Sequence, residues 1–231
     1  MVVLPYAPLG STRSRCGGSY RWVRLWLYVV AAMIFAMVVV GGITRLTGSG
    51  LSITEWAPIL GSLPPMSAAD WDAAFARYRE IPQFRLLNAG MSLEEFRAIY
   101  WWEWSHRFLG RAVGVVFAVP FVVFALTGAI PRARLPRFTL LLALGALQGA
   151  VGWWMVASGL VDRVSVAPYR LATHLTLAAV IFAAVLWTAL TLSDAGRAPR
   201  RSPLRRIGAG LVLFWVFVQI FLGALVAGND A

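Results

Sequence analysis

The stretch Tyr100-Trp-Trp-Glu-Trp-Ser-His-Arg-Phe-Leu-Gly-Arg111 joins a polar part of the chain to a long apolar run. Its polar side chains include one acid, one imidazole and two guanidiniums, at Glu103, His106, Arg107 and Arg111. On a helix these positions fall near one face, because residues three or four apart are neighbours. We therefore expect a chemically unusual cluster at the rim of a membrane-spanning helix.

The hydrophobic content of the chain is that of a polytopic membrane protein. Hydrophobic residues make up 59% of the 231 residues, and the mean hydropathy is +0.71, above the range of soluble domains. Five stretches reach the roughly 20 apolar residues that a transmembrane helix needs: Leu25–Ile43, Phe108–Ala129, Phe138–Ala157, Leu171–Leu192 and Ile207–Ala227. We predict an all-α membrane protein, with a transmembrane four-helix bundle formed by the first four segments and the first helix of a second, missing bundle.

The distribution of charge predicts the orientation in the membrane. All 21 basic residues are arginines, and the net charge is +11. Arginines gather in residues 1–24, after the second segment and in residues 193–206, where Asp194 is the only acid. By the positive-inside rule these parts are cytoplasmic, and so is the amino terminus. Topology thus explains the positive charge, and no nucleic-acid partner is expected, because no soluble domain carries a basic face.

These features divide the chain into four parts. They are a cytoplasmic arginine-rich tail (1–24), a four-helix transmembrane half with a long outer loop (25–192, loop 44–100), a cytoplasmic linker (193–206) and a fifth transmembrane helix that starts a truncated second half (207–231). The last assignment rests on Phe221–Gly228, which faintly echoes Val39–Ile43. The single cysteine, Cys16, lies in the tail, so neither an intrachain disulfide nor a thiolate metal site is expected.

The outer loop is expected to contain one short helix and the start of a long one. Ser67 and Asp70 form a capping signature, and Trp71, Phe75 and Tyr78 follow at helical spacing. This helix could lie on the membrane surface or pack over the outer mouth of the bundle. A second capping signature, Ser92-Leu-Glu-Glu95, predicts a helix that runs without a break into the second segment.

Two glycine patterns predict close approach between helices. Gly41-Gly42 ends the first segment, and Gly145-xxx-Gly149 lies in the third, with Gln148 inside it.

The chain has two histidines, His106 and His174, on segments that run in the same direction. His106 lies 26 residues before Arg132, and His174 lies 23 residues before Arg197. Three residues of helix are about 4.5 Å, so the two imidazoles are expected at similar depth on parallel neighbouring helices. Facing histidines in a helix bundle can hold a heme iron. The alternative is that each histidine only forms hydrogen bonds, whereas zinc or copper would need more donors than two.

The nearby charged residues suit a heme site as well. Arginines match the carboxylates of heme propionates, and contact with phospholipid headgroups is their alternative role; the candidates are Arg45, Arg107, Arg111 and Arg170. Glu103 is the candidate catalytic residue, because an electron-transfer site needs no carboxylate there and an acid could move protons or position water. Its alternative role is an ion pair with Arg107 within the helix.

At this point a family resemblance becomes visible. Gly41-Gly-Ile-Thr-Arg-Leu-Thr-Gly-Ser-Gly-Leu-Ser-Ile-Thr-Glu-Trp56 and Ile99-Tyr-Trp-Trp-Glu-Trp-Ser-His-Arg107, followed by His174 and Gly223–Gly228, resemble the amino-terminal part of heme A synthase of the proteobacterial and mitochondrial type. The likeness covers most of residues 25–231.

The resemblance implies an eight-helix enzyme of two four-helix halves, each with a histidine pair. Its reaction oxidises the C8 methyl of the substrate heme O to a formyl group, which gives heme A for cytochrome oxidase assembly. The family's glutamate falls on Glu103 and its first histidine pair on His106 and His174; the heme b cofactor belongs to the second half. Implied surroundings are the lipid bilayer of a bacterial inner membrane, heme O synthase, oxidase assembly factors and a possible homo-oligomer.

The sequence departs from the family pattern in two ways. It lacks the cysteine pair that some members carry in the first outer loop, which excludes a thiol-based role. It also ends after the fifth segment, so we expect a fragment, or a partner chain that supplies the rest, and little activity alone. Two other interpretations stay open: a bis-histidine b-type electron-transfer protein, and a membrane protein without heme.

Overall fold

The structure is a computed structural model, and it describes residues 19–57, 61, 63–192 and 203–229. Within these ranges the chain is built from helices: α1 (Ser19–Leu46), α2 (Ala68–Arg79), α3 (Pro82–Leu87), α4 (Leu93–Leu126), the 3₁₀ turn η2 (Arg132–Arg134), α5 (Leu135–Ala157), α6 (Pro168–Thr191) and α7 (Pro203–Gly228). The predicted all-α class is confirmed. Residues 1–18 of the expected tail, including Cys16, and residues 193–202 of the expected linker lie outside the described residues. Residues 19–24, assigned to the tail, belong to α1, and residues 203–206, assigned to the linker, belong to α7.

Five of these helices are long and apolar enough to cross a membrane, which confirms the five predicted segments. The largest difference is in the second segment, which the apolar run alone places at Phe108–Ala129. The helix begins at Leu93 because Ser92 and Glu95 form the predicted capping box, with Ser92 N–H donating to Glu95 Oε2 at 2.7 Å. It ends at Leu126, where Gly128 takes a positive φ of 71° and turns the chain.

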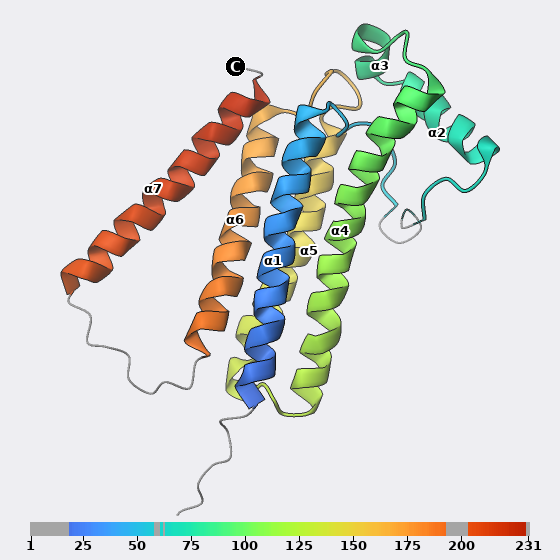
Figure 1. Cartoon of the computed structure of the whole chain (residues 1–231). Helices are drawn as coiled ribbons and strands as arrows, with labels where there is room; N and C mark the ends of the chain where they lie inside the picture. Colours follow the sequence, from blue (N-terminus) through green and yellow to red (C-terminus); the bar gives the residue numbers. More distant parts are fainter. Residues whose placement is uncertain (1–18, 58–60, 62, 193–202, 230–231) are drawn as a thin grey trace, which may run out of the picture.

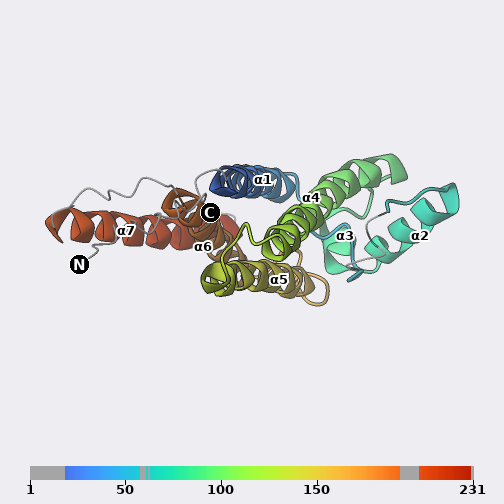
Figure 2. The same ribbon diagram turned by 90° about the horizontal axis from the view of Figure 1, so that it is seen from below.

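Helices α1, α4, α5 and α6 form an up-and-down bundle (Figure 1). Helix α1 packs on α4 and α6, and α5 packs on the same two helices from the other side. Helices α4 and α6 are therefore diagonal across the bundle, as the view along the helices shows (Figure 2). The prediction that the two histidine-bearing helices are direct neighbours is wrong, since α1 and α5 lie between them.

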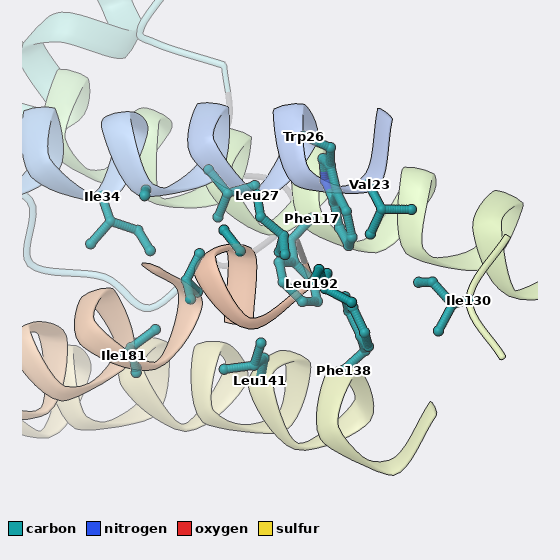
Figure 3. Close-up of a cluster of buried hydrophobic side chains, with 14 residues drawn as sticks. Val23, Trp26, Leu27, Ile34, Phe117, Ile130, Phe138, Leu141, Ile181 and Leu192 are labelled. Atoms are coloured by element: carbon teal, nitrogen blue, oxygen red, sulfur yellow. The ribbon is translucent and has the colours of Figure 1, made fainter. Parts of the chain in front are cut away.

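An aromatic core fills the end of the bundle away from α2 and α3 (Figure 3). The rings of Trp26 and Phe138 stack with centroids 6.0 Å apart, and Phe121 stacks on Phe138 at 6.0 Å. Trp26 also donates from Nε1 to the carbonyl of Val116 at 2.7 Å, which satisfies its only polar atom. This core fixes the bundle and leaves the opposite end, called the outer end here, to carry the polar residues.

The outer end is covered by α2 and α3, which form a cap. Trp71, Phe75 and Tyr78 of α2 are buried against Phe96 and Tyr100 at the start of α4. Ser67 caps α2, and Asp70 completes the predicted capping box. Of the two alternatives for this helix, the structure therefore shows packing over the outer end of the bundle.

Helix α7 packs on α6 near the outer end and diverges from it towards the other end (Figure 1). A Cβ on Gly228 would lie 2.7 Å from Cα of Pro168, so the two backbones are nearly in contact there. Gly145 and Gly149 on α5 have no heavy atom of another element within 4 Å of a built Cβ. The predicted close-packing signature of α5 therefore marks no helix contact in the described chain.

The aromatic core is expected to control the stability of the bundle. Phe138→Ala removes a side chain with 0% exposure that stacks on two rings. Unfolding titrations in mixed micelles should show a loss of about 2 kcal/mol or more, mainly packing energy, because lipid is as apolar as the core. Leu140→Ala on the same helix is the control, since Leu140 is 58% exposed, and equal losses in both variants would contradict the assignment of the core.

Candidate functional site

Glu103 is the centre of the polar cluster at the outer end. Its side chain lies on the first third of α4 and is only 2% exposed. Oε2 accepts hydrogen bonds from Ser52 Oγ and from the backbone N–H of Ile53, both at 2.8 Å. Oε1 forms an ion pair with Arg107, one turn further along the helix. The predicted alternative role of Glu103 is thus present, and it is combined with two contacts to the outer loop.

Arg107 extends this cluster to the loop that follows α1. Its guanidinium donates to the carbonyls of Ile53 at 2.6 Å and Glu55 at 3.0 Å. It also lies over the ring of Trp153 on α5, 5.7 Å from the centroid. Hydrogen bonds of Glu103 and Arg107 therefore hold residues 52–55 against α4. A buried carboxylate is tolerated here because charged and neutral donors satisfy both of its oxygens.

A second network holds the turn that leads into this loop. Gly48 takes a positive φ of 64°, and its carbonyl accepts a hydrogen bond from Gln83 Nε2 at 3.1 Å. Tyr78 donates to Gln83 Oε1 at 3.0 Å and accepts from Asn88 at 2.7 Å. Burial raises the pKa of Tyr78, so its hydroxyl keeps the proton that it donates. The cap is thus connected to Glu103 by hydrogen bonds at both ends of the turn at residues 48–53.

His106 lies one turn after Glu103 on α4 and is packed against α1. A Cβ on Gly41 would lie 3.0 Å from His106 Nε2, closer than side chains normally approach. Of the predicted Gly41-Gly42 pair, Gly41 therefore makes the close approach, and it meets an imidazole rather than a backbone. Gly42 has nothing within 4 Å of a built Cβ.

His174 lies near the start of α6 and is packed in the same manner against α5. A Cβ on Gly152 would lie 2.9 Å from His174 Cε1. Gln148, one turn earlier on α5, reaches His174 Nδ1 at 3.1 Å. The two imidazoles thus belong to diagonal helices of the bundle, and each lies against a glycine of an intervening helix.

The four candidate arginines all donate to backbone carbonyls of the described chain. Arg107 takes the loop contacts given above, and Arg111 donates to Ala57 at 2.9 Å. Arg45 donates to the carbonyl of Ala227 on α7 at 2.8 Å, and Arg170 donates to Trp154 at 2.7 Å and lies over its ring.

Sequence reasoning missed several residues of the site. Ser52 and Ile53 belong to the quoted motif, but nothing in their spacing predicts contact with a carboxylate about fifty positions later. Gly152 carries no pattern of its own, and Gln148 is noticed only as a polar residue in an apolar helix. Within the described ranges, no three His, Cys, Asp or Glu side chains gather in a way that could hold a metal ion.

The Glu103–Arg107 pair is expected to stabilise the outer loop. Arg107→Leu would leave a buried carboxylate without its cation, a change that costs about 3–5 kcal/mol where the site cannot relax. Hydrogen exchange should show faster exchange of the amides of residues 49–56, and thermal unfolding should begin at lower temperature. Arg97→Leu is the matched control, because its pair with Glu94 is exposed and worth about 0–1 kcal/mol. Loop exchange as slow as in the control would contradict this role.

The sequence is similar to one family of known proteins over most of its length. A profile of the COX15-CtaA family, described as cytochrome oxidase assembly protein, matches residues 24–231. A protein of Caulobacter sp. (strain K31) named heme A synthase is 60% identical over 214 residues, which cover 91% of this chain and 62% of that protein. No solved structure matches.

Two further relatives, both also named heme A synthase, give the same result. The protein of Bradyrhizobium diazoefficiens is 60% identical over 213 residues, 92% of this chain and 59% of its own length. That of Azorhizobium caulinodans is 58% identical over 214 residues, 92% of this chain and 61% of its own length. The chain thus spans about three fifths of the length of the curated relatives it matches.

Proposed function

The chain belongs to the COX15-CtaA family of cytochrome oxidase assembly proteins, and from this premise we propose that it is the heme O-binding part of a heme A synthase. Its five apolar helices make it a multi-pass membrane protein. The proposed reaction is the oxidation of the C8 methyl of heme O to a formyl group. The proposed setting is the inner membrane of a bacterium, with the amino terminus in the cytoplasm and the α2–α3 cap on the other side.

The observation that carries this proposal is a pair of imidazoles on diagonal helices at the outer end of the bundle, each packed against a glycine of an intervening helix. Histidines on facing helices can hold a heme iron, and His106 on α4 and His174 on α6 would be its two ligands. Gly41 and Gly152 let the two rings lie against α1 and α5, where a Cβ would be too close to the imidazole. These residues suit a heme, and we assign them to the substrate heme O.

The heme b site of the family is not proposed for residues 1–231. Residues 1–231 contain two histidines, and both are used for heme O. The heme b cofactor that the family implies would need ligands from outside these residues, so no step is derived through it. Heme O synthase, oxidase assembly factors and a second copy of the chain are the proposed partners.

We assign Arg45, Arg111 and Arg170 to the propionates of heme O or to lipid headgroups, since each is within five positions of a residue of the histidine site along its helix and donates to a backbone carbonyl. Arg107 is assigned to the loop instead, because it already neutralises Glu103 and fills two backbone acceptors. A guanidinium matches a carboxylate better than it matches a carbonyl, so a propionate can replace a backbone acceptor of the other three.

Glu103 is proposed to serve the protons of the reaction. Conversion of a methyl to a formyl group with oxygen from water removes four electrons and four protons in all. A carboxylate one turn from an iron ligand, hydrogen-bonded to the hydroxyl of Ser52, can accept such protons or orient the water. The electrons require an acceptor that the described residues do not include.

Heme O binding is the direct test of the histidine assignment. Residues 1–231 in lipid nanodiscs should bind ferric heme O with the low-spin spectrum of two imidazole ligands. His106→Ala and His174→Ala should each lose that spectrum and bind at least about tenfold more weakly. Thr173→Ala is the control, because Thr173 is exposed and next to His174 in sequence. A low-spin spectrum that survives in either alanine variant would remove that histidine from the site.

The role of Glu103 is tested in a chimaera that joins residues 1–231 to the remaining part of the Caulobacter relative. Glu103→Gln should keep heme O binding but lower heme A formation by about 100-fold or more, the usual contribution of a general acid or base. Ser52→Ala is the control for loop disturbance, since it removes one hydrogen bond and keeps the carboxylate.

The pigments extracted from cells that make heme O identify the product. Formylated heme in the parent chimaera supports the enzyme, whereas bound heme without any formylated product supports the electron-transfer alternative. Equal heme A yields in the parent and in Glu103→Gln would remove Glu103 from the mechanism.

A further inference from the structure

Gln148 is the one polar side chain of α5 that contacts a histidine of the proposed site. Its Nε2 lies 3.1 Å from His174 Nδ1 and 3.0 Å from the backbone carbonyl oxygen of His174. Gly152, one turn further along α5, lies against Cε1 and Nδ1 of the same ring. Helix α5 therefore both orients the imidazole and leaves space for it.

The geometry of this contact determines which nitrogen of His174 carries the proton. The backbone carbonyl of His174 can only accept, so the Gln148 atom 3.0 Å from it is the amide nitrogen, a donor, and Nδ1 next to the same nitrogen accepts with its lone pair. In a neutral imidazole the proton then lies on Nε2, and that nitrogen cannot bind a metal. The Oε1 atom of Gln148 is buried and has no hydrogen-bond partner among the described residues. The arrangement thus leaves one buried acceptor unused, which is unfavourable.

Binding of iron by Nε2 reverses these requirements. The Nε2 lone pair must be free, so the proton moves to Nδ1, which becomes a donor. The carbonyl oxygen of Gln148 can take this bond after its amide group rotates, a rotation that also gives up the bond from Gln148 Nε2 to the His174 carbonyl. The unused acceptor then gains a partner, and the imidazole gains the hydrogen bond that metal-ligating histidines almost always make.

We propose that Gln148 is a positioning residue that sets the protonated nitrogen of His174: its amide nitrogen holds the Nε2–H form without heme, and its carbonyl oxygen accepts from Nδ1–H when iron is bound. This inference rests on the proposed function, since it takes His174 as an iron ligand. A purely structural role would need only the bond to the His174 carbonyl, which already joins α5 to α6. The bond to Nδ1 is what ties Gln148 to ligation.

The heme-free half of the inference can be tested without substrate. The chain has two histidines, so ¹⁵N-histidine spectra in nanodiscs contain two imidazoles, and His106→Ala leaves the signals of His174 alone. The expected form of His174 is Nε2–H, with Nδ1 accepting a hydrogen bond. After Gln148→Met the Nδ1 resonance should move to the position of an imidazole without that bond. A dominant Nδ1–H form in the unsubstituted Gln148 background would overturn this half.

The heme-bound half is tested by titration with ferric heme O. Gln148→Met, which keeps the length of the side chain but removes its polar atoms, should weaken binding about tenfold or more and shift the low-spin electron paramagnetic resonance signal. Gln148→Glu should restore the binding and make the midpoint potential more negative, because a carboxylate acceptor makes the imidazole a stronger ligand. Gln219→Met on α7 is the matched control, since Gln219 is exposed.

The outcomes separate this inference from the function on which it rests. If the wild-type chain gave no low-spin heme, the proposed function would fail, and the heme-bound half would fail with it. If the wild type bound heme normally and Gln148→Met had the same affinity, signal and potential, only the inference would be overturned. A lower thermal stability of Gln148→Met with unchanged spectra would likewise show that Gln148 only joins the two helices.

Discussion

The buried ion pair between Glu103 and Arg107 is the interaction on which the outer end of the protein depends. Glu103 is almost fully removed from solvent, and a carboxylate there is stable only with a cation and donors around it. Arg107 supplies the cation, and its remaining N–H groups hold the carbonyls of Ile53 and Glu55. The loop in turn returns two donors to the carboxylate. Replacing Glu103 or Arg107 therefore disturbs both α4 and the loop, because the hydrogen bonds of each side chain depend on the other.

A second constraint comes from the diagonal arrangement of α4 and α6. Two imidazoles can approach across a four-helix bundle only if the two helices between them carry little at that level. Gly41 on α1 and Gly152 on α5 meet this need, each beside one ring. The aromatic core at the opposite end holds the helices of the bundle together. The glycines of the site are thus explained by the side chains that they face.

Sequence alone predicted most of the fold, because apolar length and capping residues act locally. Ser92 and Glu95 fixed the start of α4, and Trp71, Phe75 and Tyr78 fixed the buried face of α2. It failed where the outcome depends on packing between distant segments. The order of the helices around the bundle produces no periodic pattern in the sequence, and the prediction that α4 and α6 are neighbours is wrong for this reason. The spacing in Gly145-xxx-Gly149 indicates a possible contact but cannot show whether a helix covers it, and here none does.

The guanidiniums of Arg107 and Arg111 relate the loop to the proposed substrate. The loop after α1 is held by guanidiniums that donate to its carbonyls, from Arg107 to Ile53 and Glu55 and from Arg111 to Ala57. A carboxylate is a stronger acceptor than a carbonyl, so a propionate that reaches Arg111 displaces Ala57 from it. Arg107 does not exchange in this way, because Glu103 already provides its carboxylate. Arg107 therefore holds residues 53–55 through a pair that a propionate has no reason to break, whereas a propionate on Arg111 would compete with the carbonyl of Ala57.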